Sequence, residues 1–207
     1  MSEAPEIATA ADRVMPGVWH WRVHNSRIGG SISSCQLLTS NNGAVLVDPI
    51  RLDEAAFAEL PAVTAICLTA KCHQRSAWHY RTLTGAPVWA PAGAAEMEQR
   101  PDHRYDEGEL LPGRLRALRT PGPEPVHYCL LAEDRDALVC SDLLMRGEQG
   151  DLRYVPLEYH DDPDATRASV AGLLDHDFTL LLLDHGPPVA DGKAAIRALL
   201  AGDTATA

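Results

Sequence analysis

Two groups of short, apolar, β-rich runs constrain the fold of this chain most strongly. The first group comprises residues 18–23, 33–38 and 44–47, and the second comprises residues 128–131 and 137–140. Helix-like segments separate and follow the two groups. A sheet must bury its apolar face against another layer. The pattern therefore predicts two sheets packed together with helices outside, a four-layer αββα sandwich of the α/β class.

Turn and cap residues mark several element boundaries. Asn41-Asn42-Gly43 suits a tight hairpin, because these residues tolerate positive φ. Asp53 and the pair Asp162-Pro163 are helix starts, since aspartate caps a helix and proline fits its first position. The remaining expected strands are 64–68, 86–90 and 179–183, and the remaining expected helices are 53–60, 76–84, 94–99 and 194–200.

Length and charge narrow the class of protein. The 207 residues suit one domain, 1–207, in which we expect residues 1–15 to be a flexible leader. A formal net charge of -11 disfavours a nucleic-acid partner, which usually meets a basic face. No apolar run is long enough to span a bilayer, and the N-terminus lacks the signal-peptide pattern. With five cysteines and no C-x-x-C, we expect reduced thiols and a cytoplasmic protein without a membrane partner.

Polar loops follow four of the β-like runs. They begin at Asp48, Ala70, Ser141 and Asp184. Loops at strand ends are where sites are commonly built on such a scaffold. We expect a site wherever these four loops meet.

Six segments then establish a family resemblance. They are LVDP (46–49), LT with the His-bearing loop and helix (68–80), GAPVWAP (85–91), TPGPEP (120–125), VCSDLLM (139–145) and LLLDHGPPV (181–189). Their order and spacing resemble the metallo-β-lactamase superfamily over about residues 16–200. The resemblance implies a dinuclear zinc or iron centre that activates water for hydrolysis.

The chain departs from the family's ligand pattern. The four ligand positions of the H-x-H-x-D-H loop fall on Ala70, Cys72, Gln74 and Arg75, and Pro123 replaces the histidine of T-P-G-H. Only Asp142 and His185 match the late ligands. Alanine cannot bind a metal, and arginine brings a permanent positive charge. The resemblance therefore implies a depleted metal site.

Three residues are the candidate catalytic groups: His73, Asp142 and His185. The candidate metal ligands are Asp142, His185 and Cys72, for either no ion or one divalent ion, with zinc the ion that this set suits. Plainer roles stay open. Asp142 and His185 would equally brace their loops, and Cys72 would be an ordinary thiol.

Arg75 and two residues before the Asp162 helix are candidate ligand-binding groups. Arg75 with His73 would hold an anion, although pairing of Arg75 with Asp142 is the alternative that we favour. Tyr159 and His160 would contact a substrate or merely cap the helix. His127 is expected to have a core or surface role.

The residues leave two functions open, and whether the protein is an enzyme stays undecided. One is a hydrolase acting on a small ester or thioester with one metal or none. The other is a metal-free binding or scaffold module that uses the same cleft for an anionic small molecule or a protein partner. Homodimerisation is the generic expectation for such a domain.

Overall fold

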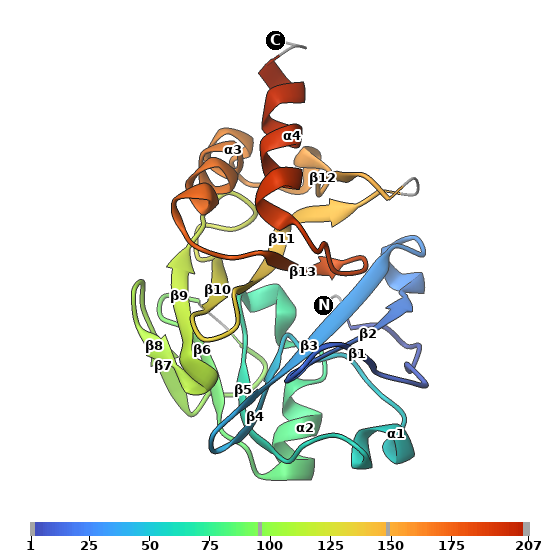
Figure 1. Cartoon of the computed structure of the whole chain (residues 1–207). Helices are drawn as coiled ribbons and strands as arrows, with labels where there is room; N and C mark the ends of the chain where they lie inside the picture. Colours follow the sequence, from blue (N-terminus) through green and yellow to red (C-terminus); the bar gives the residue numbers. More distant parts are fainter. Residues whose placement is uncertain (1–2, 95–96, 148–149, 205–207) are drawn as a thin grey trace.

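The protein forms two β-sheets, each covered by helices on its outer face (Figure 1). The computed structural model describes residues 3–94, 97–147 and 150–204. Within these residues the first sheet has the strand order β1-β2-β3-β4-β5-β6-β7. The second has the order β12-β11-β10-β9-β8, and β13 pairs with β11. The predicted αββα sandwich is confirmed.

The strands of the first sheet come from the first half of the chain. They are β1 (Asp12–Met15), β2 (Val18–His24), β3 (Ile32–Ser40), β4 (Gly43–Val47), β5 (Val63–Cys67), β6 (Val88–Pro91) and β7 (His103–Tyr105). Strands β1 to β4 are antiparallel, and β4 to β7 are parallel. The hairpin between β3 and β4 closes with Ser40 opposite Gly43, as the Asn-Asn-Gly turn predicts.

The second sheet comes from the second half of the chain. Its strands are β8 (Leu110–Leu111), β9 (Leu115–Arg119), β10 (Tyr128–Ala132), β11 (Ala137–Arg146), β12 (Leu152–Tyr154) and β13 (Leu180–His185). Neighbouring strands are antiparallel except for β11 and β13, which are parallel. That parallel pairing brings the ends of β11 and β13 to one edge, which matters for the site.

Helices cover the outer faces of both sheets (Figure 1). They are α1 (Glu54–Ala58), α2 (Ala77–Thr84), α3 (Pro163–Gly172) and α4 (Gly192–Thr204). Asp53 and Asp162 accept backbone N–H groups at the starts of α1 and α3, which confirms both predicted caps. A helix near residues 94–99 was also expected. Residues 95–96 lie outside the described residues, and residues 94 and 97–99 are not helical.

Three apolar clusters correspond to the three interfaces between the four layers. One lies between the first sheet and α1 and α2, and includes Trp21, Leu46 and Tyr80. The second joins the two sheets, and the third lies between the second sheet and α3 and α4. Burial of apolar side chains in all three is the main source of stability for such a stack.

The expected leader over residues 1–15 is wrong for its described part. Ala4 and Ala8 are buried in the first cluster, and Asp12–Met15 pairs with β2. The alternation of apolar residues before position 16 is weak, so local sequence did not reveal this strand. No described helix is long and apolar enough to cross a membrane.

Candidate functional site

The four polar segments meet at one edge of the sheets, although the two that were expected as loops after residues 140 and 183 lie within strands. Asp48 follows β4, Thr69 to Arg75 follow β5, Ser141 and Asp142 lie in β11, and Asp184 and His185 end β13. Both strand pairs, β4 with β5 and β11 with β13, are parallel. The carboxyl ends of parallel strands lie at the same edge, where α/β proteins place their ligands. The convergence expected from the sequence is therefore present.

His73 is buried at the centre of this convergence. It lies in a short 3-10 segment, Lys71–Gln74, which brings its ring back over the sheet edge. Its Nδ1 is 3.1 Å from Asp48 Oδ2 and 3.2 Å from Asp184 Oδ2. The hydroxyls of Thr69 and Ser141 lie 3.0 and 2.9 Å from the same nitrogen. Because carboxyl and hydroxyl oxygens surround it, Nδ1 carries a proton that it can donate to them.

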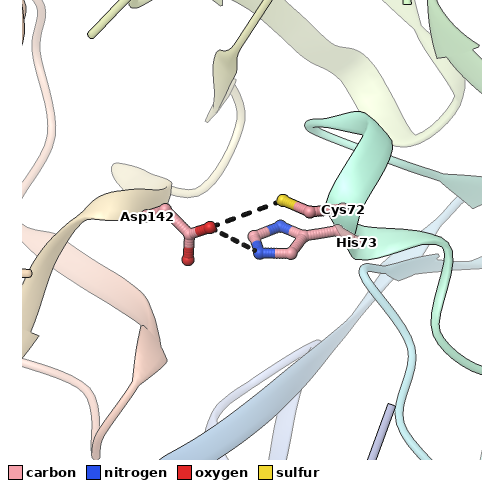
Figure 2. A group of neighbouring side chains, drawn as sticks. All are labelled: Cys72, His73 and Asp142. Carbon is pink, nitrogen blue, oxygen red and sulfur yellow. Dashed lines mark hydrogen bonds and ion pairs between the residues drawn. The ribbon is translucent and has the colours of Figure 1, made fainter. Parts of the chain in front are cut away.

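The other nitrogen of His73 faces Asp142. Nε2 of His73 is 3.0 Å from Asp142 Oδ2, and Cys72 Sγ lies 3.6 Å from the same oxygen. Figure 2 shows the thiol and the imidazole side by side on one loop, both directed at the carboxylate on β11. Thiol, imidazole and carboxylate thus meet around one point.

His185 holds the second oxygen of Asp142. Its Nε2 is 2.8 Å from Asp142 Oδ1, while its Nδ1 donates to the carbonyl of Ile32 at 2.6 Å. The carboxylate therefore has an imidazole on each oxygen. The side chains of Asp142 and His185 are 20% and 14% exposed, so this part of the site reaches solvent while His73 does not.

Asp48 is fixed by the loop that follows β5. Its Oδ1 accepts the backbone N–H of Thr69 at 2.9 Å, and its Oδ2 accepts the Thr69 hydroxyl at 2.5 Å. Burial raises the pKa of Asp48, but the positive charge of His73 and its hydrogen bond outweigh burial, so the net pKa is lowered. Asp48 is therefore a carboxylate.

The charges of the other buried groups follow from their neighbours. Burial lowers the pKa of His73, but the charge of Asp142 and further neighbours raise it well above its ordinary value. Burial and the negative charge of Asp48 raise the pKa of Asp184 well above its usual range. The pKa values of Asp48 and Asp142 are lowered and those of His73 and Arg75 are raised, so two carboxylates face two cations in this buried cluster.

Arg75 pairs with Asp184, so the favoured prediction of an Arg75–Asp142 pair is wrong. Its Nη1 is 3.3 Å from Asp184 Oδ2 and donates to the carbonyls of Ser34 and Asp48 at 3.0 and 3.2 Å. The backbone angles of a residue set the direction in which its side chain leaves the main chain. Arg75 has the unusual values φ 34° and ψ -120°. The guanidinium is fully buried and lies beside Asp184.

Two residues with strained backbone frame the site. Asp48 has φ 48° and Arg75 has φ 34°, in a region that side chains other than glycine rarely adopt. Such strain persists where surrounding contacts over-determine it, and it is concentrated at functional sites. Both residues carry the buried contacts just described, which supply that constraint.

The candidate Cys72 lies beside the carboxylate with its thiol protonated. Burial raises the pKa of Cys72 to about 12. A thiol with that pKa is a weak nucleophile, because the thiolate is the reactive form. The thiolate is also the form that binds a metal, so Cys72 has to lose its proton before it acts in either role.

His127 is the site residue that sequence reasoning missed. It is fully buried, and its Nε2 accepts the backbone N–H of Asp142 at 3.2 Å. It also forms an isolated antiparallel bridge with Ala70. Burial lowers the pKa of His127 to about 4, so its ring is neutral. The sequence holds no local signal for this role, because its partners are distant along the chain.

The two candidate residues before α3 differ from each other. Tyr159 is 74% exposed. His160 is buried, and its Nδ1 lies 2.7 Å from the hydroxyl of Thr166 in the first turn of α3. The expected bracing of the helix start is therefore present at His160. Contact with a substrate stays a prediction for both residues.

Two groups in the described residues have the composition and spacing of a metal site. Cys72, His73 and Asp142 form one group, which is partly exposed. Asp48, His73 and Asp184 form the other, which is buried. His73 belongs to both. The structure thus groups His73, rather than the predicted ligand His185, with Cys72 and Asp142.

Comparison with known proteins identifies the family. The model of the metallo-beta-lactamase superfamily matches residues 12–202. The chain belongs to the metallo-β-lactamase superfamily. No curated protein matches the sequence. The superfamily assignment covers all four loops of the site.

Several solved structures share the fold of this chain. A metallo-β-lactamase family protein from Thermus thermophilus is 20% identical, with 93% of this chain and 81% of that chain covered and a TM-score of 0.68. The metallo-β-lactamase FIM-1 from Pseudomonas aeruginosa in its mono-zinc form is 15% identical, with 100% and 99% covered and a TM-score of 0.67. TTHA1623 in a di-iron-bound form is 26% identical, with 79% and 92% covered and a TM-score of 0.63.

Proposed function

We propose that this superfamily member is a hydrolase that holds one divalent metal ion, with zinc the best match, between Cys72, His73 and Asp142. One observation carries the proposal. The Nδ1 of His73 is fixed by the Asp48 carboxylate at 3.1 Å, which leaves Nε2 facing Asp142 and Cys72. A metal-binding histidine ordinarily donates its other ring N–H to such a carboxylate.

The donor set suits a catalytic rather than a structural ion. Catalytic zinc sites use three protein ligands and keep one position open. Cys72 and Asp142 are partly exposed, so a substrate can reach the fourth position. A divalent ion, when bound, polarises a carbonyl oxygen and activates water for hydrolysis. The mono-zinc form of FIM-1 supports a one-ion site on this fold.

A second ion does not suit the inner group of Asp48, His73 and Asp184. Arg75 Nη1 lies 3.3 Å from Asp184 Oδ2, and a guanidinium keeps its charge at every relevant pH. A divalent ion beside it would meet strong repulsion in a poorly solvated place. We infer that Arg75 replaces one of the two ions expected for the family, so the dinuclear centre is depleted.

The protein groups around the ion have separate tasks. The Nε2 of His185 lies 2.8 Å from Asp142 Oδ1, and this contact holds the carboxylate in place. Because His185 is partly exposed and outside the ligand group, it is available to move a proton to or from a substrate. The substrate class that we propose is a small ester or thioester.

A metal-free binding module is the second candidate, and a specific observation favours it. Both oxygens of Asp142 already have imidazole partners, and the cations His73 and Arg75 lie among the buried carboxyl groups without an ion. In that case the cleft would hold an anionic small molecule or a protein partner. No disulfide bond joins any of the cysteines in the described residues, which supports a cytoplasmic location for either candidate.

Hydrolysis assays on metal-free and reloaded protein test the proposal. The substrates are p-nitrophenyl acetate and an acyl thioester, and the protein is stripped with EDTA and reloaded with one equivalent of Zn²⁺, Fe²⁺ or Mn²⁺. We expect turnover only after reloading, and loss of turnover in Asp142→Asn. Asp164→Asn is the matched control, because its side chain is 96% exposed and remote from the site. Equal turnover with and without metal would contradict a metal-dependent hydrolase.

A further inference from the structure

We propose that His127 is a positioning residue that fixes the main chain of Asp142, and thereby the carboxylate that we assign to the metal. The expected effect of His127 on metal binding rests on the proposed function. Its contact with the main chain of Asp142 does not. His127 belongs neither to the ligand positions that the family resemblance implies nor to the two candidate metal groups.

Asp142 lies where regular sheet pairing fails. The ladder between β11 and β13 runs from Ala137 to Cys140 and resumes only at Met145. Residues inside such an irregularity have backbone groups without ladder partners. A buried or half-buried N–H needs another acceptor. The N–H of Asp142 finds this acceptor in Nε2 of His127, at 3.2 Å.

The tautomer of His127 is set from its other side. Nδ1 lies 2.8 Å from the carbonyl oxygen of Thr120, which can only accept a hydrogen bond. Nδ1 is therefore the N–H donor, and Nε2 presents a lone pair. The imidazole thus connects Thr120, the residue after β9, to Asp142 in β11. A side chain without an acceptor at the Nε2 position would leave the Asp142 amide unpaired.

His127 also contacts the loop of residues 69–75, which carries Cys72 and His73. It bridges Ala70, and the next residue, Tyr128, donates its N–H to the carbonyl of Thr69 at 3.1 Å. Partners in an antiparallel bridge have their side chains on the same face of the sheet. Ala70 stands where the family resemblance places a ligand histidine, and its small side chain leaves room for an imidazole from the facing strand. His127 therefore ties the loop of Cys72 and His73 to the strand of Asp142.

The test compares His127→Asn with His127→Gln. Asparagine places a donor near the Nδ1 position, so it can keep the bond to Thr120 but offers nothing at Nε2. Glutamine can place its carbonyl oxygen at the Nε2 position and accept the Asp142 N–H. The pair therefore separates the acceptor role of Nε2 from the mere filling of space.

Two measurements are made on the wild type and both variants. The first is hydrogen exchange of the Asp142 amide in metal-free protein, with the Val139 amide in the same strand as the internal control. We expect at least about tenfold faster exchange at Asp142 in His127→Asn, slow exchange in His127→Gln, and no change at Val139. The second is Zn²⁺ affinity by chelator competition, with a loss of about 10- to 100-fold in His127→Asn and recovery in His127→Gln.

The outcomes separate the two proposals. Unchanged Asp142 exchange in His127→Asn would overturn the role of His127, as would wild-type Zn²⁺ affinity in that variant. Absence of Zn²⁺ binding in the wild type would overturn the one-ion function instead, and the exchange data would still decide whether His127 fixes Asp142. Equal acceleration at Val139 and Asp142 would show a general loosening of β11 and would also overturn the inference.

Discussion

Replacing Asp48 by asparagine tests the buried charge network at its most constrained member. Asparagine keeps the shape, and its side-chain oxygen can still accept the backbone N–H of Thr69, which Asp48 accepts at 2.9 Å. The variant loses the negative charge that faces His73 at 3.1 Å. Removal of one partner from a buried ion pair costs about 3–5 kcal/mol.

The low end of that range applies here, because Asp184 can take over part of the charge. The negative charge of Asp48 is one cause of the raised pKa of Asp184, so its removal favours ionisation of Asp184 beside His73. We therefore expect Asp48→Asn to lower the free energy of unfolding by about 3 kcal/mol. Total stability of a domain is about 5–15 kcal/mol, so the effect is a large fraction of it.

The assay is urea unfolding of metal-free protein, followed by tryptophan fluorescence at pH 7. The matched control is Asp164→Asn, an exposed partner of Arg167, for which we expect a change of less than about 1 kcal/mol. The folded pKa of Asp48 is lowered from 3.8, so its contribution is present above that pH and is lost as pH falls through the folded value. The difference between wild type and Asp48→Asn should therefore shrink in acid. A cost as small as that of the control would refute the charge network.

Two further predictions concern Arg75 and His20. Arg75→Lys should lower the free energy of unfolding by about 2 kcal/mol in urea titrations, because an ammonium cannot replace the guanidinium on both the Ser34 and Asp48 carbonyls. A free energy of unfolding equal to that of the wild type would contradict the assigned contacts. His20 is buried, and burial lowers its pKa from 6.5 to about 4. Between these two pH values the unfolded chain binds a proton at His20 that the folded chain does not. The wild type should therefore lose about 3 kcal/mol of stability as pH falls from 6.5 to 4. In His20→Gln this loss of stability between pH 6.5 and 4 should vanish. The measurement is thermal melting at stepped pH, and the same pH dependence in the variant as in the wild type would contradict the prediction.

Much of the fold could be predicted from local signals. Apolar runs bounded by turns predicted β2 to β5 and β10, and the aspartate caps at 53 and 162 predicted where two helices begin. The strands that were missed are short or sit among prolines and glycines. Strand β8 has two residues and β7 three, and such elements exist only because neighbouring strands pair with them.

The site was predicted in its loops but not in its pairings. The sequence predicted a polar segment at the end of each of four apolar runs, so the convergence of these segments could be anticipated. Asp142 and His185 nevertheless lie within β11 and β13 and not in loops after them. The partner of Arg75 could not, because the left-handed backbone at position 75 turns the side chain inward toward Asp184. His127 could not be found either, since its role depends on a bridge to Ala70 and a break in the β11 ladder.

Metal stoichiometry tests the central claim, one ion per chain with Arg75 in place of the second, most directly. The protein is purified without chelators, dialysed against Zn²⁺ and then against metal-free buffer, and analysed by inductively coupled plasma mass spectrometry. Asp142→Ala and Cys72→Ala are measured beside the Asp164→Asn control. We predict about one zinc per chain in the wild type and the control, and far less in both site variants. Two ions per chain, or none, would contradict the account.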